Sequence, residues 1–287
     1  MSTLEAVLRT PRIPFIGAVL CAVGLALTGV LAYLVPVIHN RDAVTLQGFI
    51  SLNRPRLTPL FDHVAHLADP APYALIGLSL AVVALARRRA RVALAILVLL
   101  VVTGFTTESL KHVLAHPRFS EWLGEGQIAA ASWPSGHATA AMTLALCAVL
   151  ASPARMRPAV AGIGALFAVS VSYAILALGW HFPSDVIGGF LVAAMWTLFA
   201  VSALVAAEGV RPARVRREPL PDVAGREGVI AVSLGAGLAV IVAAVAIARP
   251  EQISTFAEAH TSFFVVAAGI AALATALATG LARAVRT

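Results

Sequence analysis

Long apolar segments, almost free of charge, recur along the chain and determine its fold class. Each is close to the roughly 20 residues that a helix needs to cross a bilayer. Because backbone N–H and C=O groups in hydrocarbon must bond within their own segment, we expect these segments to be helices. The second is the shortest, between Pro70 and Arg87. We predict an all-α, polytopic membrane bundle with helices at 13–38, 71–86, 92–114, 135–152, 158–180, 185–207, 228–248 and 262–282.

Composition and charge agree with membrane insertion. Hydrophobic residues make up 60% of the 287 residues and charged residues 12%, which excludes an ordinary soluble domain. If the N-terminus is cytoplasmic, the inner segments hold all but six of the 21 basic residues, as the positive-inside rule requires. The basic character is therefore interpreted as topogenic, and nucleic acid is excluded as a partner. The sequence predicts a multi-pass protein of the cell (inner) membrane with both termini cytoplasmic.

The pattern divides the chain into three parts. Residues 1–207 form a predicted six-helix core, residues 208–227 a basic cytoplasmic linker, and residues 228–287 a two-helix transmembrane extension. The extension is rich in Ala, Val and Gly, and small residues permit close helix packing in lipid. It is therefore expected to dock either on the core or on a second copy of the chain, as a homo-oligomer.

Residues able to carry chemistry gather on the predicted outer side. All eight histidines fall there or in outer helix ends. Ionisable groups near a membrane are costly to desolvate and usually line a cavity or a reaction site. Three segments contain them: Lys111 with Arg118 after the third helix, the Pro134–His137 tetrad at the start of the fourth, and His181 with Asp185 between the fifth and sixth. We expect the three to meet at one membrane face.

Several of these residues suit the binding of a phosphate group. The oxygens of a phosphate ester carry negative charge, which Lys111 can balance as a point charge and Arg118 as a bidentate fork. Lys111 is the only lysine of the chain. Ser135 and Gly136 open a helix, where unpaired backbone N–H groups make an anion cradle and glycine allows close approach.

The remaining residues suit attack at phosphorus. An imidazole can act as nucleophile when a carboxylate holds its tautomer, and His181 and Asp185 stand four residues apart at a helix start. His137 is placed to protonate the leaving oxygen as general acid. Metal ligation is not predicted, because His112 and His116 have ligand spacing but no matching third ligand.

Over about residues 13–207 the chain resembles the type 2 phosphatidic acid phosphatases, integral-membrane lipid phosphatases related in their site to vanadium haloperoxidases. The resemblance lies in Lys111-x6-Arg118, the Pro-Ser-Gly-His tetrad at 134–137, and His181-x3-Asp185. It implies a phosphohistidine intermediate on His181 and neither metal nor cofactor. The implied catalytic residues are His181, His137 and Asp185, and the implied phosphate ligands are Lys111, Arg118, Ser135 and Gly136.

Two of the three motifs depart from the family pattern. Phe119 replaces the proline that follows the motif arginine, and Ile175 and Ala174 replace the arginine and serine that precede the histidine of the third motif. One guanidinium of the phosphate cradle is therefore missing. Three explanations are open. Another arginine from the first outer loop replaces the missing one, the substrate has a different charge placement, or the site binds phosphate but turns over poorly. The loop candidates are Arg41, Arg54 and Arg56.

The first functional hypothesis is a metal-independent lipid phosphatase acting on a polyprenyl or glycerolipid (di)phosphate at the extracytoplasmic face, among membrane lipids. The alternatives are a non-catalytic or weakly active lipid-phosphate-binding or partner subunit, and a lipid phosphotransferase on the same scaffold. A transporter is a weaker alternative, because the chain shows no half-to-half symmetry. Cys21 and Cys147 are expected to be apolar fillers inside helices.

Overall fold

The computed structural model describes residues 10–118, 120–123, 126–210 and 250–285, and within them every regular element is a helix. The predicted all-α membrane bundle is confirmed. The predicted helix 228–248 and most of the predicted linker lie outside the described residues. The described elements are α2 (Arg12–Leu34), α3 (Pro36–Ile50), α4 (Thr58–His66), α5 (Pro70–Ala86), α6 (Ala90–Val113), η1 (Glu121–Leu123), α7 (Gly136–Ala151), α8 (Arg157–Ala177), α9 (Pro183–Val210), α11 (Pro250–Ala259) and α12 (Thr261–Ala284).

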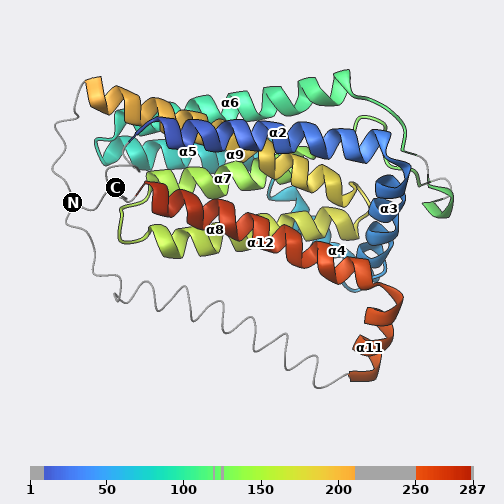
Figure 1. Ribbon diagram of the computed structural model, residues 1–287. Helices are drawn as coiled ribbons and strands as arrows, with labels where there is room; N and C mark the ends of the chain where they lie inside the picture. Colours follow the sequence, from blue (N-terminus) through green and yellow to red (C-terminus); the bar gives the residue numbers. More distant parts are fainter. Residues whose placement is uncertain (1–9, 119, 124–125, 211–249, 286–287) are drawn as a thin grey trace.

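Most of these helices lie side by side along one axis, and α3 crosses one end of the bundle (Figure 1). By length and apolar composition, α2, α6, α8, α9 and α12 are each able to span a membrane. The pair α4 and α5, bent by 50°, adds a sixth span if it is counted as one. With 16 residues, α7 is shorter than these spans.

The first predicted helix is shorter than expected, because the chain breaks before Pro36. Val35 has extended backbone angles (φ −112°, ψ 99°), and α3 begins at Pro36. A proline disfavours helical angles in the residue before it, so the segment predicted to run to residue 38 ends at Leu34. The break allows α3 to turn across the end of the bundle.

The core lies around α7, which packs against α5, α6, α8, α9 and α12. Twelve of its residues are buried, so it is apolar on all sides, as expected of a central helix. Small residues make this packing close. A Cβ on Gly164 of α8 would lie 2.9 Å from the Cβ of Ala145, and one on Gly189 of α9 would lie 2.7 Å from the carbonyl oxygen of Ser135.

Arginines gather at the end of the bundle opposite α3, where they bind helix C-termini. Arg89 donates to the carbonyl of Leu150 at the end of α7 (2.7 Å), and Arg157 donates to that of Val285 at the end of α12 (2.5 Å). The last carbonyls of a helix lack intrahelical partners and carry partial negative charge. These arginines, predicted from sequence as topogenic, therefore also cap helices.

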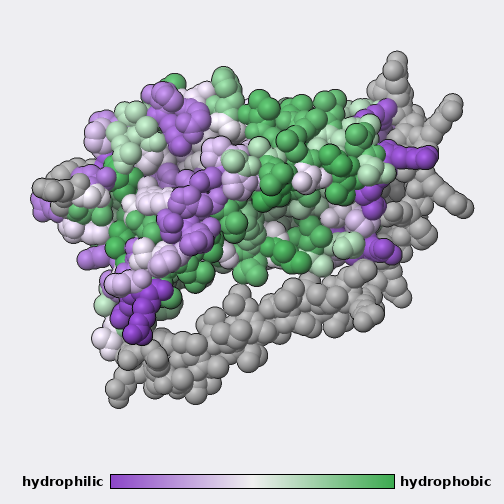
Figure 2. Space-filling model, turned by 180° about the vertical axis from the view of Figure 1, so that it is seen from behind, coloured by the Kyte–Doolittle hydropathy of each residue, from purple (hydrophilic) through white to green (hydrophobic). Residues whose placement is uncertain are grey.

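The last helix, α12, docks on the core of the same chain. It packs against α8, α3, α7 and α9. The hydroxyl of Tyr173 on α8 donates to the carbonyl of Ala267 (2.6 Å), and the rings of Phe49 and Phe263 lie 4.6 Å apart. On the face that Figure 2 shows, apolar residues cover much of the bundle, and hydrophilic residues are concentrated towards its ends. Exposed Leu20 on α2 and Val101 on α6 belong to the apolar side chains that face outward.

Candidate active site

His181 is held by a carboxylate at the start of α9. Its Nδ1 lies 3.2 Å from Oδ2 of Asp185, which also accepts a bond from the backbone N–H of Phe182 (3.0 Å). The two residues are four apart and Pro183 begins α9 between them, so the first helical turn brings the side chains together. Asp185 is fully buried. With Nδ1 engaged by the carboxylate, Nε2 is the nitrogen of His181 that is placed to react.

Arg118 binds the other oxygen of the same carboxylate. Its Nη2 donates to Oδ1 of Asp185 and to the hydroxyl of Ser132 (2.8 Å), and its Nη1 donates to the hydroxyl of Ser184 (3.0 Å). The guanidinium lies over the ring of Phe182, 4.2 Å from its centroid. A buried carboxylate requires a nearby cation. The structure therefore places Arg118, predicted as a phosphate ligand, against Asp185.

A second acidic residue, Asp42 of α3, joins this cluster and was not predicted. Its Oδ1 accepts from the backbone N–H of Ser184 (3.0 Å), and its Oδ2 accepts from the Ser184 hydroxyl (2.5 Å). Oδ2 also lies 3.5 Å from Nη1 of Arg118. Burial raises the pKa of Asp42 from 3.8 to about 6, against the opposing effect of Ser184 and Arg118. Nothing in the local sequence marks Asp42, because only the turn at Pro36 brings α3 over the site.

Lys111 lies beside the start of α7. Its Nζ donates to Glu108 Oε1 one turn earlier (2.9 Å) and lies 3.4 Å from the position that a Cβ on Gly136 would occupy. Ser135 is the N-cap of α7, and its hydroxyl accepts from the N–H of Ala138 (3.3 Å). The backbone N–H of Ser135 is engaged by the carbonyl of Asp185 (2.9 Å). Lys111 and the α7 N-terminus therefore form one positive region.

His137, in the first turn of α7, faces His181. The centroids of the two rings are 6.4 Å apart. Nε2 of His137 lies 3.1 Å from Oδ1 of Asp69, and its ring packs on Trp180 at 5.5 Å. A phosphoryl group that reacts on one side and is hydrogen-bonded on the other needs roughly 3 Å at each contact. The spacing of the rings is compatible with such a group between them.

Part of the chain is similar to a known protein family. Residues 92–208 match the sequence profile of the PAP2 superfamily. This match covers less than half of the chain, and the matched residues are called the PAP2 segment. Among solved structures, the chain is similar to the first transmembrane PAP2 type phosphatidylglycerolphosphate phosphatase from Bacillus subtilis, with 22% identity and a TM-score of 0.49, over 70% of this chain and 99% of that chain. Comparison with curated proteins gives no match.

All the site residues predicted from sequence lie in the PAP2 segment, whereas Asp42 and Asp69 precede it. Their chain neighbours carry no site motif, and each reaches the site through a bend: Asp42 after the break at Pro36, and Asp69 at the bend between α4 and α5. Trp180 stands directly before His181 in the chain. Its ring packs against that of His137.

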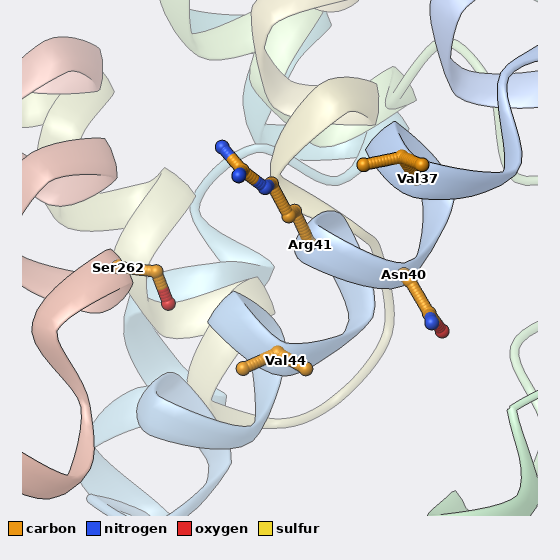
Figure 3. A pocket seen from close by; sticks show the side chains of 5 residues that line it. All are labelled: Val37, Asn40, Arg41, Val44 and Ser262. Carbon is orange, nitrogen blue, oxygen red and sulfur yellow. The ribbon is translucent and has the colours of Figure 1, made fainter.

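The position of the absent PAP2 arginine is apolar. Ile175 is fully buried in the hydrophobic core. Of the loop arginines proposed to replace it, Arg54 and Arg56 are exposed. Arg41, also exposed, lines a surface depression between α3 and Ser262 of α12 (Figure 3). The replacement of the missing guanidinium by a loop arginine stays a prediction.

Proposed function

We propose that the protein is a membrane lipid phosphatase that hydrolyses a lipid phosphate or diphosphate through a phosphohistidine on His181. The observation that carries this proposal is the pair of facing imidazoles, His181 and His137, each bound to its own carboxylate. Lys111 and the N-terminus of α7 supply positive charge beside them. The resemblance of the PAP2 segment to phosphatases supports the assignment.

In the first step, Nε2 of His181 attacks phosphorus as the bond to the leaving oxygen breaks. His137 gives that oxygen a proton, so the lipid leaves as an alcohol or as a monophosphate. Asp185 stabilises the positive charge that develops on His181, because its Oδ2 faces Nδ1. Lys111 offsets negative charge on the phosphoryl oxygens.

In the second step, a water molecule attacks the phosphorus atom of the phosphohistidine. His137, now neutral, takes a proton from that water as the P–N bond breaks and the electron pair returns to Nε2 of His181. Phosphate leaves, and both imidazoles regain their starting protonation. The cycle consumes one water and requires neither cofactor nor redox partner.

The architecture favours a lipid substrate. The site lies at one end of a bundle whose flanks are apolar, so a hydrocarbon tail can stay in the membrane while its headgroup reaches the imidazoles (Figure 2). The arginines that cap helices lie at the other end, which the positive-inside rule assigns to the cytoplasm. The proposed site is therefore extracytoplasmic.

A second candidate is a lipid-phosphate-binding subunit that turns over slowly. It is favoured because the cations of the site are already paired with carboxylates. Arg118 pairs with Asp185 and Asp42, and Lys111 pairs with Glu108. With Ile175 in place of the family arginine, little uncompensated positive charge faces a substrate.

The test is phosphate release by purified protein in detergent with polyprenyl phosphate, polyprenyl diphosphate and phosphatidic acid, with a chelator present. We expect release by the parent and only background release by His181→Ala. His137→Ala should release phosphate roughly 10²- to 10⁴-fold more slowly than the parent, because a general acid usually contributes a factor of that size. His63→Ala is the matched control, because His63 is exposed on α4 at the same end of the bundle and its Nδ1 bonds only within its helix, to the carbonyl of Pro59.

The intermediate is tested with substrate labelled in the phosphate. An acid-labile, base-stable label on the protein, present in the parent and lost in His181→Ala, supports the phosphohistidine. Tight lipid binding without release favours the binding subunit, and label passing to an added alcohol favours a phosphotransferase. Release that survives His181→Ala contradicts the proposal.

A further inference from the structure

Asp69 occupies a helix-capping position but does not cap its helix. It stands directly before Pro70, the first residue of α5, at the 50° bend between α4 and α5. An aspartate at this position usually accepts from a backbone N–H of the first turn. Here the side chain makes no capping bond. Its Oδ1 instead lies 3.1 Å from Nε2 of His137.

The other carboxylate oxygen of Asp69 faces a second histidine. Oδ2 lies 4.0 Å from Nε2 of His66, at the end of α4. The ring of Trp180 packs against both imidazoles, at 5.8 Å from His66 and 5.5 Å from His137. Trp180 therefore limits how far His137 can swing, and Asp69 sets which nitrogen points away from the site.

We propose that Asp69 is a positioning residue for His137, so that the site contains two carboxylate–imidazole pairs of different function. This inference rests on the proposed phosphatase function. Asp185 serves the nucleophile, His181, whereas Asp69 holds the Nε2–H of His137. The opposite nitrogen, Nδ1, is then the atom that donates to the leaving oxygen and later accepts from water.

The proton balance of the cycle agrees with this assignment. His137 starts as a cation, gives its Nδ1 proton to the leaving oxygen, and recovers one from the attacking water. Throughout, Nε2 keeps its proton, directed at the Asp69 carboxylate. Burial of the ring lowers the pKa of His137, and His181 and Lys111 of α6 lower it further. Asp69 opposes these effects and favours the cationic form that the acid step needs.

His137 and Asp69 are both partly exposed, with side-chain exposures of 26% and 35%. The effect of the carboxylate is therefore expected to be smaller than for a fully buried partner of a catalytic histidine, where loss reaches about 10⁴-fold. We expect Asp69→Asn to slow phosphoryl transfer from a lipid phosphate roughly 10- to 100-fold.

The experiment compares two leaving groups in single-turnover phosphorylation of His181. With a lipid phosphate the leaving group is an alkoxide, which needs a proton. With 4-nitrophenyl phosphate the leaving group is 4-nitrophenolate, which is stable without one. Asp69→Asn should slow phosphorylation by the lipid phosphate roughly 10- to 100-fold, and phosphorylation by 4-nitrophenyl phosphate by less than about threefold. The alkaline limb of the rate profile for the lipid substrate should also move to lower pH, because the cationic acid loses its carboxylate.

The matched control is Asp62→Asn. Asp62 is a half-exposed carboxylate on α4 that lies 3.6 Å from Nδ1 of His66, and Asp69 stands between His66 and His137. Its removal should leave both substrates and the pH profile unchanged. Equal losses for both leaving groups in Asp69→Asn, or no loss for either, overturn the inference while the phosphatase function stands.

A readout without turnover separates the two hypotheses. In protein labelled with ¹⁵N-histidine, neutral His137 should show the Nε2–H tautomer, and Asp69→Ala should convert it to a mixture while Asp62→Ala does not. The same tautomer in the parent and in Asp69→Ala overturns the inference even if no substrate is turned over. A parent protein that releases no phosphate but shows the expected tautomer change contradicts the proposed function only.

Discussion

At the scale of single residues, two buried carboxylates share one guanidinium. Asp185 and Asp42 both contact Arg118, and Ser184 bridges Arg118 to Asp42. One positive charge does not balance two negative charges out of water, so one carboxyl group is expected to hold its proton more tightly. Asp42 is that group, since burial raises its pKa to about 6. Asp185 keeps the Arg118 contact and remains ready to support His181.

The raised pKa of Asp42 predicts a pH-dependent stability. Because the folded pKa (about 6) lies above the ordinary 3.8, the folded protein binds more protons between these values. The stability that Asp42 contributes is full below about pH 4 and is lost as pH rises through 6. Two pKa units correspond to about 3 kcal/mol. The stability of the parent relative to Asp42→Asn should therefore fall by about that amount from pH 4 to pH 7.

Thermal unfolding in detergent, followed by circular dichroism of the helices, measures this difference at every pH. Using the difference between parent and variant cancels titrations elsewhere in the chain. Glu258→Gln, at an exposed position on α11, is the control and should run parallel to the parent. A parent and an Asp42→Asn variant whose midpoints keep a constant separation from pH 4 to 7 contradict the prediction.

These residues also show what the sequence could predict about the site. His181 and Asp185 were predictable as a pair, because four residues at a helix start make one turn whatever surrounds it. Asp42 and Asp69 were not, because each depends on a chain direction set by a bend tens of residues from the motif that it serves. The prediction of Arg118 as a phosphate ligand also lacked this context, since its carboxylate partners had not been placed.

At the scale of helices, the contact between α7 and α9 sets the distance between the two imidazoles. His137 lies in the first turn of α7, and His181 stands two residues before Pro183, the first residue of α9. Gly189 allows the helices to approach until its Cα faces the backbone of Ser135 and Thr139. The apolar pattern predicted α7 closely, at 135–152 against the observed Gly136–Ala151. It could not show that α7 is central, because uniformly apolar helices have no face that identifies their neighbours.

Gly189→Ala should therefore reduce activity without touching a catalytic group. A Cβ there would lie 2.7 Å from the carbonyl oxygen of Ser135 and 2.9 Å from the backbone nitrogen of Thr139, so the helices must separate. We expect a loss on the order of 10²-fold in kcat, the usual cost of about 1 Å of misplacement. Phosphate release checks it, and thermal unfolding records the accompanying loss of stability.

The control for this prediction is Gly104→Ala in α6, where a Cβ meets no atom within 4 Å. In a helix this substitution should be neutral or stabilising, because alanine has the higher helix propensity. Similar activity in Gly189→Ala and in the parent would show that the contact between α7 and α9 does not control the spacing of the imidazoles.

At the scale of the whole molecule, charge and chemistry occupy opposite ends. Arg89 and Arg157 cap helices at one end, while Lys111, His137 and His181 lie at the other. The sequence predicted this asymmetry from the alternation of basic and histidine-bearing loops, which needs only the order of the spans. The sequence did not predict two changes of chain direction, and each lies at a proline. One is the turn of α3 at Pro36, and the other is the bend before Pro70 that separates α4 from α5.

The asymmetry predicts that the site faces away from the cytoplasm, and single cysteines test it. Leu60 on α4 is 57% exposed at the site end, and Met156 before α8 is 41% exposed at the arginine end. Both are uncharged, so replacing them leaves the topogenic arginines intact. In a background with Cys21→Ala and Cys147→Ala, Leu60→Cys should react with an impermeant maleimide on intact spheroplasts, and Met156→Cys should react only after permeabilisation. The reverse labelling pattern would place the imidazoles on the cytoplasmic side, where lipid phosphates of the inner leaflet are the accessible substrates. The extracytoplasmic assignment would then be wrong, whereas the proposed chemistry of the site would be unchanged.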